Sequence, residues 1–217
     1  MLDCDNTLLD NDALKADLAD RLRVLLGPHR DSAFWRLYED VRAETGTVDY
    51  PRTIERFGAV LGDETLLEAV RAVVMDYPFA LRLYPDALAT LAHLSTIGQP
   101  TIVSDGDQVY QPLKIARSGL AAAVEQRVLI YVHKEVHLDE IAVRWPAEFY
   151  VMVEDKAQIL SATKARLPDR FVTIHVRQGH YGLEPVTSIP APDLTIDRIG
   201  DLRSLTLDTM RRHLAPR

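Results

Sequence analysis

The sequence predicts a doubly wound α/β fold, in which helices cover both faces of a parallel sheet and a helical segment is inserted near the start. Two observations support this prediction. From Leu83 onward, short β-branched runs alternate with helix-like segments. Residues 12–78, by contrast, show helical periodicity and no convincing strand.

The inserted segment is predicted to be helical throughout. Leucines at helical spacing form one apolar stripe that stops at Gly27 and Pro28. Asp31 or Ser32 is then expected to cap the next helix, because both side chains can accept a hydrogen bond from the first turn. The expected helices cover residues 11–26, 31–46, 51–62 and 63–77.

Four later runs are predicted to be strands, and polar residues follow the first three of them. The runs are PTIVS at 100–104, RVLIYV at 127–132, FYVMV at 149–153 and FVTIHV at 171–176. The polar groups are Asp105-Gly106-Asp107, His133-Lys134-Glu135 and Glu154-Asp155-Lys156. Because the carboxyl ends of parallel strands share one edge, these groups are expected to converge there.

The chain opens with two carboxylates, Asp3 and Asp5, on either side of Cys4. They fit the same rule if Met1 and Leu2 form the end of a strand. A buried central strand normally has about five residues. We therefore expect either that residues upstream of Met1 are missing from the sequence or that the first strand is unusually short.

Composition limits the function. With 217 residues, 47% of them hydrophobic, the chain can bury one core and a second small lobe. A formal net charge of −7 argues against nucleic acid as a partner. One cysteine excludes an intrachain disulfide framework, and no long apolar run or signal peptide is present, so we expect a cytoplasmic protein that does not bind membranes. The oligomeric state is unknown from sequence.

The polar groups together resemble the four motifs of the haloacid dehalogenase superfamily. The matching positions are Asp3-x-Asp5-x-Thr7, Ser104, Lys134 and the acidic pair Glu154-Asp155. The resemblance covers almost the whole chain. It implies a Rossmann-like core of residues 1–11 and 79–217 and an all-α cap domain of residues 12–78. Caps in similar proteins select the substrate, which makes four residues candidate selectors: Arg36, Tyr38, Tyr50 and Arg52.

The resemblance also implies catalytic roles. Asp3 would be the nucleophile that forms an aspartyl-phosphate, and Asp5 would protonate the leaving oxygen and then deprotonate water. In dehalogenating members an aromatic residue replaces the acid at the Asp5 position, because halide leaves without a proton. Asp5 therefore favours phosphoryl transfer.

Other positions are expected to hold the phosphoryl group. Ser104 would donate to a phosphoryl oxygen, together with the backbone N–H groups of Asp105 and Gly106, and Thr7 is a further candidate for substrate binding. Lys134 would bind the same group and pair with Asp3, although Glu135 stands where the family usually has proline.

A magnesium site follows from the same resemblance. Mg²⁺ prefers hard oxygen ligands, and Asp3, the backbone carbonyl of Asp5, and Asp155 would supply them. Many members have a second acid a few residues later, where this chain has Ile159. We expect Glu154 to replace that acid, directly or through water.

The expected activity is Mg²⁺-dependent hydrolysis of a small phosphorylated metabolite. Three alternatives remain open at this point: a phosphomutase, a haloacid dehalogenase, and a catalytically inactive domain that binds a ligand or a protein. The identity of the substrate cannot be predicted, because cap chemistry varies freely on one core.

Overall fold

The computed structural model describes residues 1–214 and has a parallel sheet at its centre. Leu2 lies in the middle of this sheet, where it pairs in parallel with Ile102 on one side and Val153 on the other. The order across the sheet is β2, β1, Leu2, β3, β4, β5. The strands are β1 (Ile102–Asp105), β2 (Val128–Tyr131), β3 (Tyr150–Glu154), β4 (Phe171–Val176) and β5 (Leu194–Ile196).

The composition of the strands explains why they form a buried sheet. Valine, isoleucine and aromatic residues fill the strands, and every residue of β4 is buried, as expected for an inner strand covered on both faces. The register pairs Ile102 with Val128 and Tyr150 with Phe171. Since all strands run parallel, their carboxyl ends form one edge, which the sequence predicted.

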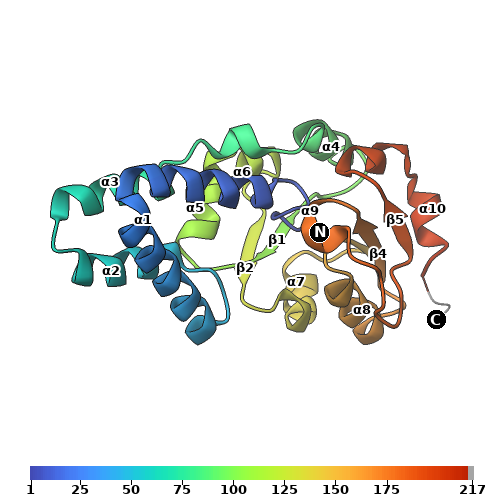
Figure 1. Ribbon diagram of the computed structural model, residues 1–217. Helices are drawn as coiled ribbons and strands as arrows, with labels where there is room; N and C mark the ends of the chain where they lie inside the picture. The colour runs from blue at the N-terminus through green and yellow to red at the C-terminus, as the bar shows by residue number, and fades with distance from the viewer. Residues whose placement is uncertain (215–217) are drawn as a thin grey trace.

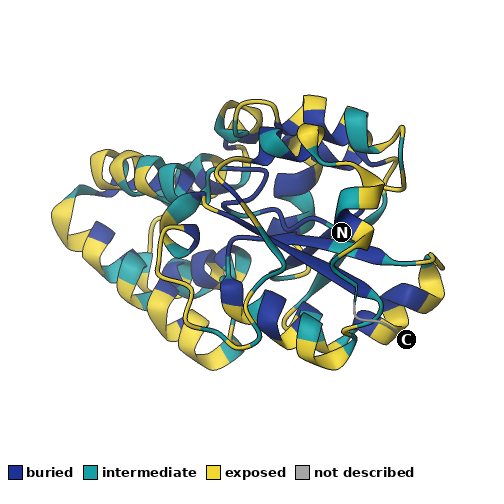
Figure 2. Ribbon diagram, turned by 90° about the vertical axis from the view of Figure 1, so that its right-hand side faces the viewer, coloured by how far each residue is buried: buried dark blue, intermediate teal, exposed yellow. Residues whose placement is uncertain are grey.

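Helices cover both faces of the sheet (Figure 1). In that view α4 and α6 lie on one side and α7 and α8 on the other. The strands at the centre are mostly in the colour of buried residues, and the exposed residues gather on the outer parts of the molecule (Figure 2). The doubly wound fold is therefore confirmed. These elements are η1 (Phe79–Arg82), α4 (Ala87–Leu94), α5 (Tyr110–Arg117), α6 (Leu120–Ala123), η2 (Lys134–Val136), α7 (Leu138–Arg144), α8 (Ala157–Arg166), α9 (Gly179–Gly182), η3 (Ile199–Ser204) and α10 (Leu207–Arg211).

The inserted segment forms a helical lobe, as predicted, made of α1 (Asn11–Thr45), α2 (Tyr50–Leu61) and α3 (Glu64–Met75). Helix α1 begins at the cap Asp10, whose carboxylate accepts a hydrogen bond from the N–H of Ala13 at 2.9 Å. It is broken at Gly27, where φ is 69° and ψ is 169°. Each face that these helices turn toward one another is apolar and buried.

One boundary in the lobe was predicted wrongly. The helix after Gly27 resumes at Pro28, so Asp31 and Ser32 lie inside it and cap nothing. Proline suits the first turn of a helix because its missing N–H has no partner there anyway. Asp31 is buried instead and accepts a hydrogen bond from the indole N–H of Trp35 at 3.0 Å.

The lobe packs against the core through aromatic side chains. The ring of Tyr50 in α2 lies 4.7 Å from that of Tyr110 in α5, and Tyr110 also contacts Phe79 of η1. Arg117 donates hydrogen bonds to the carbonyl of Met75 and to Asp76 at the end of α3. No helix within residues 1–214 combines the length and the apolar character needed to cross a membrane.

Candidate active site

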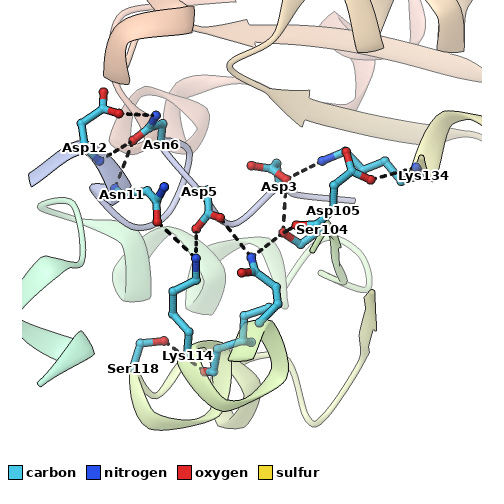
Figure 3. Close-up of polar contacts among 12 residues, drawn as sticks. Asp3, Asp5, Asn6, Asn11, Asp12, Ser104, Asp105, Lys114, Ser118 and Lys134 are labelled. Atoms are coloured by element: carbon cyan, nitrogen blue, oxygen red, sulfur yellow. Dashed lines mark hydrogen bonds and ion pairs between the residues drawn. The ribbon is translucent and has the colours of Figure 1, made fainter. Parts of the chain in front are cut away.

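The pairing of Leu2 places Asp3 at the carboxyl edge of the sheet. Its N–H donates to the carbonyl of Val153 at 3.0 Å, which fixes the backbone at this point. The carboxylate is buried, accepts a hydrogen bond from Lys134, and lies 3.5 Å from the hydroxyl of Ser104 (Figure 3). The structure thus brings together Asp3, Ser104 and Lys134, which belong to three of the four predicted motifs.

Lys134 lies at the start of η2 and is held from several directions. Its ammonium group pairs with Asp3 and, at 2.5 Å, with Glu154, and it donates to the carbonyl of Val103 at 3.2 Å. Its backbone N–H donates to Asp105 at 2.9 Å. Burial opposes the charge on Lys134, but the nearby carboxylates outweigh it and raise the pKa of this ammonium group. Glu135 in place of proline therefore leaves the lysine beside Asp3.

Three buried carboxylates gather beside this lysine. One carboxylate oxygen from each of Asp3, Glu154 and Asp155 lies within 4.8 Å of the other two. Both oxygens of Asp155 are buried, and no hydrogen-bond donor in the described part of the chain reaches them. Since a buried anion without a partner is costly, and carboxylate oxygens are the ligands Mg²⁺ prefers, these residues fit a divalent cation.

The pKa values within this cluster differ with the partner of each group. Burial, aided by Glu154, raises the pKa of Asp3 to about 7 in spite of Lys134. Burial, again aided by Glu154, raises the pKa of Asp155 to about 10. Burial also acts on Glu154, but the ammonium group of Lys134 overcomes it and holds the pKa of Glu154 below its ordinary value. Asp155 is therefore the carboxylate that most needs a cation to be ionised.

Asp5 points to a different set of partners. Its carboxylate accepts a hydrogen bond from the ammonium of Lys114 at 2.5 Å and one from the amide of Gln111 at 3.2 Å (Figure 3). The same amide donates to Ser104 at 2.9 Å, so Gln111 links two motif residues. Lys114 is almost fully buried and also donates to Asn11.

Neither of these α5 residues was predicted from the sequence to belong to the site. Gln111 and Lys114 are three apart, which places them on one face of a helix. The three-residue spacing of Gln111 and Lys114 is the only sequence signal that places them together. It does not show that this polar face of the helix turns inward.

Three of the predicted substrate-binding positions have contacts that were not expected. The N–H of Gly106, predicted to bind phosphate, donates to the carbonyl of Tyr131 at 2.8 Å in this structure. Gly106 is needed for space, because a Cβ there would lie 2.8 Å from the side chain of Gln111. Asp105 uses its carboxylate to hold Lys134. Thr7 is fully buried. It is not among the residues that line the cavity described next.

A cavity of about 400 Å³ opens where the lobe meets this edge of the sheet. Asp5, Asp105 and Asp155 line it from the core. Of the four candidate selectors in the lobe, Tyr38 and Tyr50 line it, whereas Arg36 and Arg52 are not among the lining residues. The cavity therefore lies between Asp5 and the helical insertion, whereas Asp3, Ser104 and Lys134 are not among its lining residues.

Comparison with known proteins identifies the family. Models of protein families give no match, and neither does a search of curated proteins. Among solved structures, a haloacid dehalogenase-like hydrolase from Burkholderia xenovorans LB400 is 45% identical, with 94% of this chain and 96% of that chain covered and a TM-score of 0.85. The chain belongs to the haloacid dehalogenase-like hydrolases.

More distant structures share the fold. An L-2-haloacid dehalogenase from Xanthobacter autotrophicus with covalently bound chloropropionic acid is 19% identical over 94% of this chain and 96% of that chain, with a TM-score of 0.59. The magnesium-bound hydrolase YfnB from Bacillus subtilis is 18% identical over 94% and 95%, with a TM-score of 0.57. At these identities the similarity supports the fold alone.

Proposed function

We propose that this hydrolase is a Mg²⁺-dependent phosphatase that acts on a small phosphorylated metabolite. The observation that carries the proposal is the buried carboxylate cluster, in which Asp155 has no donor within residues 1–214. A divalent cation bound by Asp3, Asp155 and the carbonyl of Asp5 would offset the negative charge of a phosphoryl group. Glu154, which is also paired with Lys134, would serve as the second acid, directly or through water.

The residues of the chain then divide the reaction into two steps. Asp3 attacks phosphorus, a bond forms from its carboxylate oxygen, and the bond from phosphorus to the leaving oxygen breaks. Asp5 supplies the proton that the leaving oxygen needs. In the second step water attacks phosphorus and gives its proton to Asp5, and the bond from phosphorus to Asp3 breaks to release inorganic phosphate. Ser104 and Lys134 hold the phosphoryl oxygens near Asp3, and the core residues 1–11 and 79–217 carry all of these groups.

Asp5 also supports phosphoryl transfer over dehalogenation. Halide leaves as a stable anion, so a second acid beside Asp3 has no proton to supply in that reaction. Here Asp5 lines the cavity and is held there by Lys114 and Gln111. We therefore propose phosphate esters, and not haloacids, as the substrates.

Release of inorganic phosphate from a panel of small phosphate esters, measured with Mg²⁺ or with EDTA, tests the proposal. We expect turnover that requires Mg²⁺, disappears in Asp3→Asn and survives in Asp20→Asn, an exposed carboxylate on α1. Halide release from 2-chloropropionate is the parallel assay. Halide without phosphate would identify a dehalogenase, and neither product from folded protein would indicate a binding domain.

A further inference from the structure

Lys156 lies between β3 and α8, next to Asp155, but forms no ion pair with the carboxylates beside it. Asp3 and Glu154 pair with Lys134 instead. The ammonium group of Lys156 lies 5.2 Å from the centre of the Tyr181 ring, and within residues 1–214 no carboxylate forms an ion pair with it. Both Lys156 and Tyr181 line the cavity.

A second pair of the same kind lies on the lobe side of the cavity. The ammonium group of Lys15 in α1 is 4.8 Å from the centre of the Tyr38 ring, and both residues line the same cavity. Its nearest carboxylate is Glu39, at 4.0 Å, which is too long for a hydrogen bond. A lysine over a tyrosine ring therefore faces the cavity from the core and from the lobe.

Two acids of the cavity wall, Asp5 and Asp12, are held by basic groups other than these lysines. Asp5 is paired with Lys114 at 2.5 Å, and Asp12 with His180 at 2.7 Å. Asp12 also fixes α9, which carries Tyr181, because it accepts a hydrogen bond from the backbone N–H of His180 at 2.8 Å.

Lys156 lies close to Asp155 and Glu154, and Lys15 lies close to Glu39. Within residues 1–214, however, neither ammonium group donates a hydrogen bond to a carboxylate. Both can therefore donate to an anion in the cavity.

We propose that Lys156 and Lys15 form a second anion subsite, which receives a carboxylate or phosphate carried by the leaving group of the substrate. This subsite rests on the proposed phosphatase function, in which the first phosphoryl group lies at Asp3. The substrate class would be phosphate esters with a second negative charge. Tyr38 and Tyr181 would lie beside the carbon chain between the two anionic groups.

The dissociation constants of three non-hydrolysable phosphonates, measured by calorimetry in the presence of Mg²⁺, test this subsite without requiring turnover. Propylphosphonate, 3-phosphonopropanoate and ethane-1,2-bisphosphonate differ only in whether the end of the chain is a methyl, a carboxylate or a second phosphonate. We expect at least one of the doubly anionic ligands to bind the parent about ten to a hundred times more tightly than propylphosphonate, the range for a hydrogen bond to a charged group. Comparing these two ligands distinguishes carboxylate from phosphate.

The variants decide which residues hold the second anion. Lys156→Gln and Lys15→Gln should each remove most of that preference, and Lys156→Arg should retain it. Arg30→Gln, an exposed control on α1, should leave it unchanged. Equal binding of the three phosphonates by the parent, or a preference that survives both glutamine variants, would overturn the subsite. Failure of the phosphatase proposal is distinguishable from failure of the subsite. In that case the protein would still prefer the doubly anionic phosphonates but would release no inorganic phosphate from phosphate esters.

Discussion

At the scale of single residues, the site is governed by buried charges that need one another. Lys134 is 1% exposed and is the cation that contacts both Asp3 and Glu154. Removing one partner of a buried ion pair leaves the others without compensation, which costs more than the intact pair contributes. The lysine is therefore as important to stability as to the chemistry proposed for it.

Lys134→Met should lower the free energy of unfolding by about 3 kcal/mol at neutral pH, because Asp3 and Glu154 would remain buried without their cation. Urea denaturation followed by circular dichroism measures this difference. Arg30→Gln, which changes an exposed charge on α1, should stay within about 0.5 kcal/mol of the parent. A loss below 1 kcal/mol in Lys134→Met would contradict the buried cluster.

Asp5→Asn should reveal a proton donor through its dependence on the leaving group. General acid catalysis contributes about 10²- to 10⁴-fold, but only where the leaving oxygen needs a proton. Turnover of an alkyl phosphate should therefore fall by at least a hundredfold, whereas that of p-nitrophenyl phosphate, whose leaving group is stable as an anion, should fall far less. Equal losses on the two esters would exclude Asp5 as the acid.

Residues at strand ends could be predicted, and residues on helix faces could not. Asp3, Ser104, Lys134 and Asp155 follow short apolar runs, so topology alone brings them to one edge. Gln111 and Lys114 depend on how α5 is rotated against the sheet. That rotation is decided by tertiary packing, which one sequence does not contain.

At the scale of elements, the break in α1 shows how one residue separates two helices. Gly27 has φ 69° and ψ 169°, a region that side chains other than glycine avoid. The sequence predicted the stop but placed the next start at Asp31 or Ser32, because it could not show that the chain turns within a single residue. Most other helix and strand boundaries fell within a few residues of the observed ones.

Gly27→Ala should destabilise the protein by about 1–3 kcal/mol through backbone strain alone. A Cβ at this position would meet no atom within 4 Å, so no steric clash contributes. Gly98→Ala is the matched control, since its Cβ would also meet nothing and its φ is not positive. If both variants have the parent's free energy of unfolding, the break does not require glycine.

Asp17 of α1 ties the lobe to the segment that returns to the core. Its carboxylate accepts hydrogen bonds from Tyr77 at 2.6 Å and Arg82 at 2.7 Å. The hydroxyl of Tyr77, followed by Arg21, lowers the pKa of Asp17 below its ordinary value of 3.8. The folded state thus favours the ionised form, and this stabilisation is present above about pH 4 and lost as pH falls through the folded pKa.

Asp17→Asn should therefore lower the free energy of unfolding by about 2 kcal/mol at pH 7, the effect of losing charge-assisted hydrogen bonds. The difference from the parent should shrink as pH falls from 4 toward 2, because Asp17 of the unfolded parent, with its ordinary pKa of 3.8, then takes up a proton and favours unfolding. Denaturation at several pH values measures it. Asp20→Asn, exposed on the same helix, should show neither effect, and a difference for Asp17→Asn that stays constant with pH would rule out the ion pair.

At the scale of the whole molecule, the sheet and the inserted lobe meet at the edge where the motif residues converge. The sequence predicted both parts, because alternation and periodicity are local patterns. It could not predict the cavity between them, since Tyr38, Tyr50 and Lys15 reach it only through the packing of α1 and α2 on the core. The proposed substrate preference therefore depends on tertiary structure more than on any motif.

Binding of Mg²⁺ should stabilise the whole protein, and Asp155→Asn should separate this effect from folding itself. At a hundred times its dissociation constant, a ligand specific for the folded state adds about 2.7 kcal/mol, which for this size raises Tm by about 5–10 °C. Thermal unfolding with Mg²⁺ and with EDTA measures the shift.

Without a cation, the raised pKa of Asp155 keeps its carboxyl protonated at pH 7, so asparagine replaces one neutral group by another of similar size. The variant should therefore unfold in EDTA close to the parent temperature and gain little from Mg²⁺. A variant that gains as much as the parent would place the ion away from Asp155. A variant already unfolded in EDTA would show instead that the carboxylate supports the fold, because a neutral asparagine could then not replace it.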